Sequence, residues 1–93
     1  MENQHRKITG YRELNQEEID LMNEIKALGP KIEEILIKVQ NTVDEQRNES
    51  IVKPAEHERM ENATPERFLA LAKTDFQTAL MYTTRAVAQP EFF

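Results

Sequence analysis

The sequence has 93 residues, with 12 Lys and Arg against 17 Asp and Glu, and therefore a formal charge of -5. Leu, Ile, Val and Phe make up about 24% of it, just above the roughly 20% below which highly charged chains are disordered. We therefore expect one small folded domain over residues 1–93. The acidic balance argues against a protein that coats DNA or RNA, but it is compatible with a small anion held by a few local cations.

Several classes of protein are excluded by what the sequence lacks. It has no Cys for disulfides, and a chain of this size buries only about 60% of its unfolded surface, so association between copies is the expected supplement. His5 and His57 are too isolated for a metal site. No apolar run approaches the roughly 18 residues of a membrane span, and no segment resembles a signal peptide. We expect a soluble, cytoplasmic protein without metal or cofactor.

The first 12 residues form a locally basic arm. Arg6, Lys7 and Arg12 stand there against Glu2 alone. Tyr11 lies at the end of this arm, just before the first predicted helix. An aromatic ring and cations therefore occur together at the start of the chain.

A long first helix is predicted to begin near Gln16 and to run to about Arg47. Asn15 and Glu18 have the spacing of a capping box, in which each side chain bonds the backbone N–H of the other residue. Apolar residues then recur at the three- and four-residue steps of a helical stripe. These are Ile19, Met22, Ile25, Leu28, Ile32, Ile35, Val39 and Val43.

Gly29 and Pro30 interrupt this helix in its middle. Pro30 has no N–H for the Lys26 carbonyl, and its ring crowds that oxygen, so we expect a kink. Because the apolar pattern continues from Leu28 to Ile32, one bent helix is favoured over two separate helices.

Residues 48–62 are mostly polar and are predicted to be a linker and turn. Thr64, Pro65 and Glu66 then supply an N-cap, a Pro at the first helical position and an acid in the first turn. The second helix should end before Pro90 after about 24 residues. The predicted fold is all-α, an antiparallel hairpin of a kinked long helix and a second helix, preceded by a short N-terminal arm.

Two helices leave apolar residues uncovered on the outside of such a hairpin. Self-association would cover them, whereas the alternative is that they are scattered surface residues of a monomer, which is ordinary in globular proteins. The residues concerned are Leu21, Leu36, Ile37 and Leu71.

The residue set suits binding better than catalysis. There is no Cys, no Ser in a Gly-rich turn, and too little Gly for a phosphate-cradling loop. The acid pairs Glu17–Glu18 and Glu33–Glu34 fit a solvated helical face better than general acid–base chemistry. Tyr11, Lys26, the basic arm and the terminal Phe92–Phe93 would suit a nucleotide, since bases stack on rings and cations bind phosphate. The alternative is a frayed basic arm with an aromatic tail that anchors the core.

Several motifs resemble one known family. They are Gly10–Leu14 (GYREL), Asp20–Lys26 (DLMNEIK), Pro65–Ala70 (PERFLA), Lys73–Gln77 (KTDFQ) and Arg85–Pro90 (RAVAQP), with Phe93 last. The sequence resembles the phage anti-CBASS proteins of the second type, which are cyclic-nucleotide sponges. This resemblance implies a homohexamer in the cytoplasm of the infected bacterium. It also implies that the protein binds cyclic dinucleotides, and in some members cyclic trinucleotides at separate sites, without cleaving them.

The resemblance also implies roles for individual residues. Tyr11 should stack on a base and Lys26 should contact the cyclic phosphate backbone. Arg12, Gln89 and Pro90 adjoin the matched motifs and are candidate pocket neighbours. Each of the three also has a structural alternative. Arg12 can pair with Glu13 or Glu17, Gln89 can satisfy carbonyls at the helix end, and Pro90 can stop the helix.

A second group of residues is a candidate for the trinucleotide site. Arg67 and Thr74 lie two turns apart on one helical face, with Lys73 adjacent. The helix N-terminus there offers N–H groups to an anion. Phe68 replaces a Trp that is common in the family, which is a conservative change.

Two functions compete, therefore, with an enzyme as a weaker third. The first is a cyclic-nucleotide sponge with no catalytic residues. The second is a helical-hairpin oligomer that serves as a protein–protein interaction module. Both predict the same fold, and they differ in whether Tyr11 and Lys26 line a cleft that takes a small anion.

Overall fold

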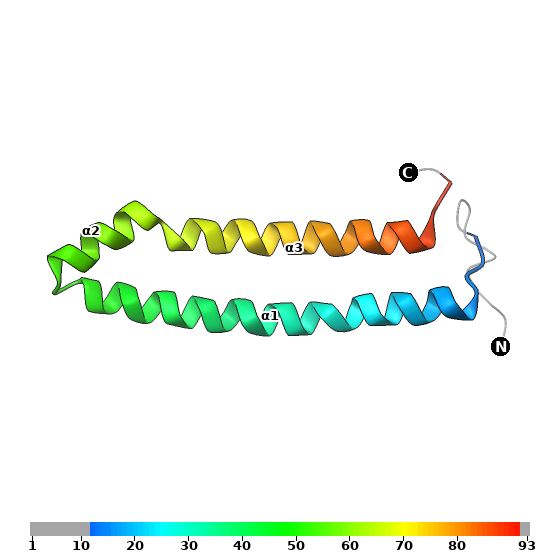
Figure 1. Ribbon diagram of the computed structural model, residues 1–93, viewed down its shortest axis with the longest axis horizontal. Helices are drawn as coiled ribbons and strands as arrows, with labels where there is room; N and C mark the ends of the chain where they lie inside the picture. The colour runs from blue at the N-terminus through cyan, green and yellow to red at the C-terminus, as the bar shows by residue number, and fades with distance from the viewer. Residues whose placement is uncertain (1–11, 92–93) are drawn as a thin grey trace.

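Two long helices lie side by side and run in opposite directions, joined at one end by a short helix (Figure 1). The computed structural model describes residues 12–91. Its helices are α1 (Gln16–Ser50), α2 (Pro54–Ala63) and α3 (Pro65–Ala88), and no strand occurs among the described residues. We call the corner formed around α2 the closed end. The opposite end, where α1 begins and α3 finishes, is the open end.

Helix α1 begins as the sequence predicts. The Asn15 side chain accepts a bond from the Glu18 N–H at 2.9 Å, and the Glu18 carboxylate accepts the Asn15 N–H at 2.9 Å. This capping box satisfies two N–H groups that otherwise lack helical partners. The helix passes through Pro30 without a break and is bent along its length (Figure 1). The expectation of one bent helix is therefore confirmed.

The prediction of an irregular linker over residues 48–62 is wrong, because α1 runs on to Ser50 and α2 occupies most of the remainder. Pro54 stands at the first turn of α2, where its missing N–H costs nothing. Met60 is only 1% exposed. A single buried anchor gives no periodic signal in the sequence, so the helix could not be recognised from its apolar pattern.

Thr64 separates α2 from α3 and adopts the left-handed conformation with φ 44°. Its N–H donates to the Met60 carbonyl at 2.9 Å, which ends α2. Its carbonyl accepts the Arg67 N–H at 3.1 Å, which begins α3. Thr64 therefore holds the predicted N-cap position, but its side chain makes no capping bond, contrary to the usual role of Thr at this position.

Ion pairs tie the closed end together. The Arg47 guanidinium donates to Glu66 Oε1 at 2.9 Å, to Glu61 Oε1 at 2.9 Å and to the Met60 carbonyl at 3.4 Å. The Arg47 side chain of α1 is thus hydrogen-bonded to both α2 and α3. The hydrogen bond from the Arg47 side chain, together with one from the backbone N–H of Glu66 itself, lowers the pKa of Glu66 to about 2.

Little of the chain is enclosed. Among the described residues, the buried apolar side chains are Val43 and Met60. The accessible surface is 7653 Å², against about 5,600 Å² for a compact protein of this mass. The radius of gyration is 20.1 Å, against about 12 Å for a compact chain of this length. A single hairpin therefore lacks a closed core.

The side of α1 that faces α3 differs from the predicted stripe. Leu28, Ile35 and Val39 are 46%, 59% and 42% exposed, whereas Gly29 and Leu36 turn toward α3 in their place. Of the residues expected outside the hairpin, Leu21, Ile37 and Leu71 are exposed, but the expectation is wrong for Leu36. Helix α1 thus has two adjacent apolar stripes, and α3 covers only one of them.

Candidate functional site

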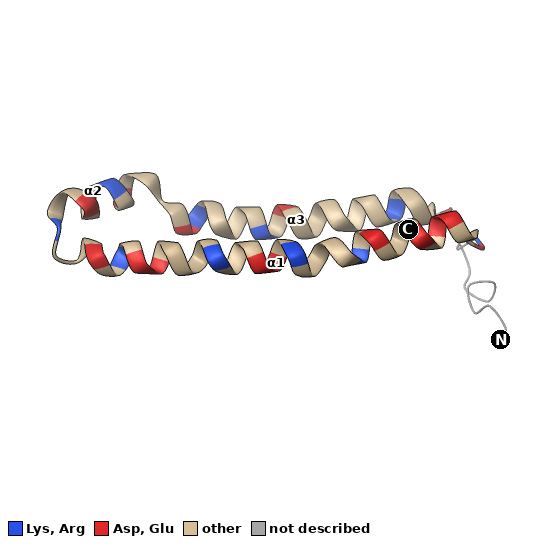
Figure 2. Cartoon of the chain, turned by 60° about the horizontal axis from the view of Figure 1, so that its bottom comes forward, with Lys and Arg blue, Asp and Glu red and all other residues tan. Residues whose placement is uncertain are grey.

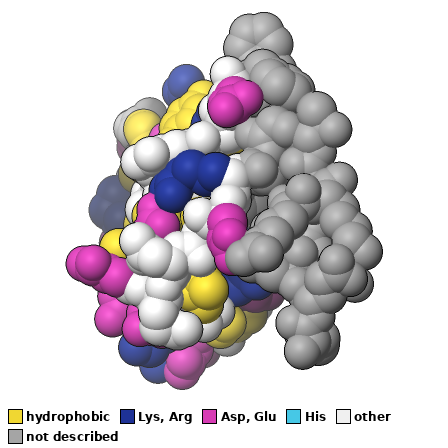
Figure 3. Space-filling model, turned by 90° about the vertical axis from the view of Figure 1, so that its right-hand side faces the viewer, with side chains coloured by type: hydrophobic (Ala, Val, Ile, Leu, Met, Phe, Trp, Pro, Cys, Tyr) yellow, Lys and Arg dark blue, Asp and Glu magenta, His cyan; other side chains and the backbone are white. Residues whose placement is uncertain are grey.

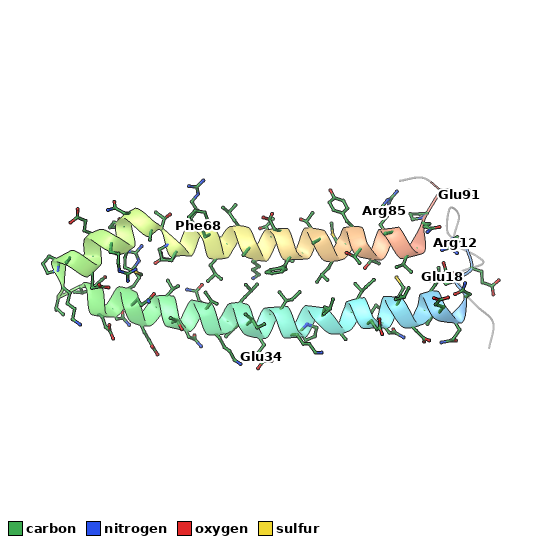
Figure 4. The ribbon with its side chains drawn as sticks, in the orientation of Figure 1. Arg12, Glu18, Glu34, Phe68, Arg85 and Glu91 are labelled. Atoms are coloured by element: carbon green, nitrogen blue, oxygen red, sulfur yellow. The ribbon has the colours of Figure 1, made fainter. Side chains whose placement is uncertain are left out.

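The open end is held by a bidentate ion pair that also reaches α3. Arg12 donates from Nη1 to Glu18 Oε1 at 3.1 Å and from Nη2 to Glu18 Oε2. Nη2 also donates to the Val87 carbonyl at 2.8 Å. Figure 4 shows Arg12 and Glu18 together at this end, and Figure 3 looks directly onto it, with basic and acidic side chains side by side. The hydrogen bond from Arg12 lowers the pKa of Glu18, and the same bond raises the pKa of Arg12.

Gln89 and Pro90 finish α3 next to this ion pair. Gln89 adopts the left-handed conformation with φ 48°, and its N–H donates to the Arg85 carbonyl at 2.8 Å. Pro90 cannot continue the helix because it has no N–H. Arg12 bonds the carbonyl of Val87, two positions before Gln89. The structure therefore brings the three predicted pocket neighbours to one end of the hairpin, where each has a structural role.

Tyr11 lies outside the described residues, as do the cations Arg6 and Lys7 and the terminal Phe92 and Phe93. The pairing of Tyr11 with Lys26 therefore remains a prediction.

Lys26 lines a groove between the two long helices. This groove has a volume of about 320 Å³, and its other lining residues include Gly29 of α1 and Leu80 and Thr84 of α3. Gly29 and Leu80 also line a second groove of about 400 Å³, which continues along the hairpin as far as Lys73. Because the two grooves share these residues, they form one furrow along this side of the hairpin. We call it the lysine furrow.

Lys73 belongs to the lysine furrow and not to the surface that carries Arg67 and Thr74. It lines the second groove and also a third, of about 350 Å³, that extends toward the closed end. Neither Arg67 nor Thr74 lines any of these grooves. The Arg67 guanidinium lies 5.8 Å from the centre of the Phe68 ring, and Phe68 points away from α1 (Figure 4). The structure therefore separates Lys73 from the other two predicted trinucleotide residues.

Charge is distributed unevenly between the helices that form this furrow. Asp and Glu are concentrated on α1 and α2, whereas α3 carries few of them (Figure 2). Glu33 lines the furrow together with Lys73. The walls are otherwise mostly apolar, with Ile32, Leu36 and Phe76 among them. A planar group with an anionic edge would match this combination of apolar wall and ammonium groups.

Sequence reasoning missed two features of this region, namely the furrow that joins Lys26 to Lys73 and the bond from Arg12 to α3. The first depends on the register between antiparallel helices, and the second joins residues 75 positions apart. Neither leaves a local signal in the sequence. Sequence reasoning suggested Glu13 or Glu17 as the acid that pairs with Arg12, whereas the structure pairs Arg12 with Glu18. This pairing had a partial signal, because the capping box already placed the Glu18 carboxylate at the start of α1.

Within residues 12–91, no group of three or more His, Cys, Asp or Glu side chains is placed to hold a metal ion. None of the helices in that range is both long enough and apolar enough to cross a membrane.

Comparison with known proteins gives the family. The sequence profile described as "Acb2/Tad1, hairpin domain" matches residues 3–88. The chain belongs to this family. Anti-CBASS protein 2 of Pseudomonas phage JBD67 is 42% identical to it, in an alignment that covers 98% of each chain. The resemblance drawn from the motifs is confirmed, and the family's hairpin corresponds to the antiparallel pair α1 and α3.

Proposed function

We propose that this protein blocks CBASS anti-phage signalling in the cytoplasm of the infected bacterium by binding cyclic nucleotides and holding them intact. Its principal ligands are cyclic dinucleotides, and cyclic trinucleotides occupy a second site. The observation that carries the proposal is the match, along nearly the whole length of both chains, to a protein named for anti-CBASS activity.

The lysine furrow supports a cyclic dinucleotide as the ligand. Such a molecule carries two phosphates and two planar bases. Lys26 and Lys73 offer two compact positive charges along one furrow. Leu80, Met81 and Thr84 of α3 line the same groove as Lys26, seven to eleven positions along α3 from Lys73. At 1.5 Å per residue, the two lysines are about 10–16 Å apart along the helix axis.

Assembly into a homohexamer is part of the same proposal. The hairpin leaves large apolar side chains exposed on α1 and α3, including Ile35, Leu71 and Phe76 at 59%, 46% and 43%. Copies of the chain that pack on these faces would bury them, and would also close the furrow into a pocket that excludes water. Pockets that bury most of a small ligand are the usual form of such sites.

Release of intact ligand is the direct test. The purified protein is mixed with a panel of cyclic di- and trinucleotides, freed of unbound ligand and denatured, and the released material is analysed by chromatography. We expect intact cyclic nucleotide in amounts stoichiometric with the protein. Linear products would show an enzyme instead. If no panel member is retained, and a host protein co-purifies with the hairpin, the interaction module is the better description.

A further inference from the structure

Three polar side chains on the walls of the lysine furrow are available to a ligand. Glu33 of α1 and both Lys73 and Gln77 of α3 line its groove of about 400 Å³. Within residues 12–91, none of these three side chains makes a hydrogen bond or an ion pair. The groove therefore offers a ligand one carboxylate, one ammonium group and one amide.

The Glu33 carboxylate restricts which ligands suit this groove. Its neighbours there are mostly apolar, and the ring of Phe76, which is 43% exposed, supplies a flat wall on which a base can lie. A carboxylate repels the phosphates of a nucleotide. It favours a nucleotide only where the base presents N–H groups that the two carboxylate oxygens can accept.

Guanine matches this carboxylate better than the other bases. The edge that it uses in base pairing carries the N1–H and N2–H₂ donors side by side, so it can donate to both oxygens of one carboxylate in a charge-assisted pair. The O6 beside them is an acceptor, for which the Gln77 amide carries donors. Adenine and cytosine offer one amino group next to a ring nitrogen that accepts, and uracil offers one N–H between two carbonyl oxygens.

We propose that Glu33 is a specificity-determining residue, which selects guanine as the base that lies against Phe76 in the lysine furrow. This inference rests on the proposed function, because the base belongs to the bound cyclic dinucleotide. Lys73, across the same groove, then serves the phosphates while Glu33 binds the edge of the base. The alternative is that Glu33 and Lys73 only attract each other across the furrow, and such an attraction gives no preference among bases.

Two ligands that differ by one amino group test the proposal. The first is the cyclic dinucleotide with two guanines, and the second carries hypoxanthine in their place. Hypoxanthine keeps N1–H and O6 but lacks the N2 amino group. Because this removes a hydrogen bond to a charged acceptor, we expect the wild-type protein to bind the hypoxanthine ligand about tenfold more weakly by calorimetry.

Glu33→Gln should abolish this preference. Gln replaces one acceptor oxygen by a donor group and removes the charge, so the ratio of the two Kd values should fall to about one. The two ligands carry the same charge, so a general electrostatic change leaves the ratio alone. Glu34→Gln is the matched control, because it removes a charge next to Glu33 from a side chain that points away from α3 (Figure 4) and pairs with Lys38 at 3.4 Å. Its ratio should stay about tenfold.

The possible outcomes separate the role of Glu33 from the proposed function. Equal binding of the two ligands by the wild-type protein would overturn the selection of guanine and leave the proposed function standing. A tenfold ratio that persists in Glu33→Gln, or that is lost equally in Glu34→Gln, would overturn the role of Glu33. If the wild-type protein binds neither ligand and no other cyclic nucleotide of the panel, the proposed function fails, and selection by Glu33 fails with it.

Discussion

Lys26 and Tyr11 are the two residues for which ligand contact is most directly expected. Lys26→Ala should weaken binding of cyclic dinucleotides because it removes a charge from the lysine furrow. Tyr11→Ala should weaken it by about 1–3 kcal/mol through the loss of a base stack. Calorimetry measures both effects, with circular dichroism to confirm that the helices remain. Unchanged affinity in both variants would remove them from the site.

Lys73 and Arg67 should affect different ligands. Lys73 lines the same furrow as Lys26, so Lys73→Ala should lower the affinity for cyclic dinucleotides. Arg67 is exposed outside the furrow, so Arg67→Ala should weaken cyclic trinucleotides and leave dinucleotides nearly unchanged.

Competition between the ligands checks this assignment. The protein is saturated with a dinucleotide and titrated with a trinucleotide, and simultaneous binding is the expected result. Complete competition would show one shared pocket for both ligands.

Glu66 should make the stability of the hairpin depend on pH. Its bonds to Arg47 lower its pKa from 4.5 to about 2, so the folded state binds a proton less readily than the unfolded state. The resulting stabilisation is complete above about pH 4.5 and is lost as the pH falls toward 2. The thermal midpoint, measured at one protein concentration, should fall as the pH is lowered through this range. The thermal midpoint of Glu66→Gln should fall less over the same range. An equal decline in both would assign the acid sensitivity to other carboxylates.

At the scale of the helices, Gly29 is unfavourable for α1. Apart from its two neighbours in the chain and the backbone of α1 itself, no atom lies within 4 Å of the place that a Cβ would occupy there. Ala is favoured over Gly by about 0.5–1 kcal/mol inside a helix, but the ring of Pro30 crowds the Cβ of the residue before it, so Gly29→Ala should stabilise α1 by less than this amount. Ala27→Gly, at an exposed position of the same helix with no Pro after it, should destabilise α1 by the full amount and lower the thermal midpoint. A thermal midpoint that falls further in Gly29→Ala than in Ala27→Gly would mean that another copy of the chain packs against Gly29.

The start of α1 and both ends of α3 could be predicted because the signals that set them are local. The capping box of Asn15 and Glu18, Pro65 at the start of α3 and Pro90 after its end each act within a few residues of their own position. Helix α2 could not be predicted in this way. Its burial depends on Met60, which is enclosed only once the corner of the hairpin has formed.

Which face of α1 packs against α3 could not be predicted from the sequence either. Two apolar stripes run next to each other along α1, and Gly29 contributes nothing to the hydrophobic pattern of the one that α3 covers. The choice depends on the side chains of α3. The candidate site has the same limitation, because Lys26 and Lys73 share a furrow through the register of the two helices and not through their spacing in the sequence.

At the scale of the whole molecule, the exposed apolar stripe should determine the state of association. Light scattering is expected to give a mass near that of six 10.9 kDa chains. Ile35 is 59% exposed on a single hairpin, so Ile35→Asp should leave that hairpin intact but break the assembly. Asn41→Asp adds the same charge at an exposed position of α1 and should leave the assembly intact. A wild-type mass near one chain would contradict the assembly.

The corner around α2 also sets the order in which the two ends of the hairpin form. The Arg47–Glu66 bond at the closed end joins residues 19 positions apart, whereas the bond from Arg12 to Val87 at the open end joins residues 75 positions apart. Loop closure costs more entropy as the loop lengthens, so pairing should spread from the corner toward the open end. The open end is then the last part to form and the first to fray. Since the part of the lysine furrow that Lys26 lines is toward that end, a bound nucleotide would stabilise the part of the hairpin that opens most readily.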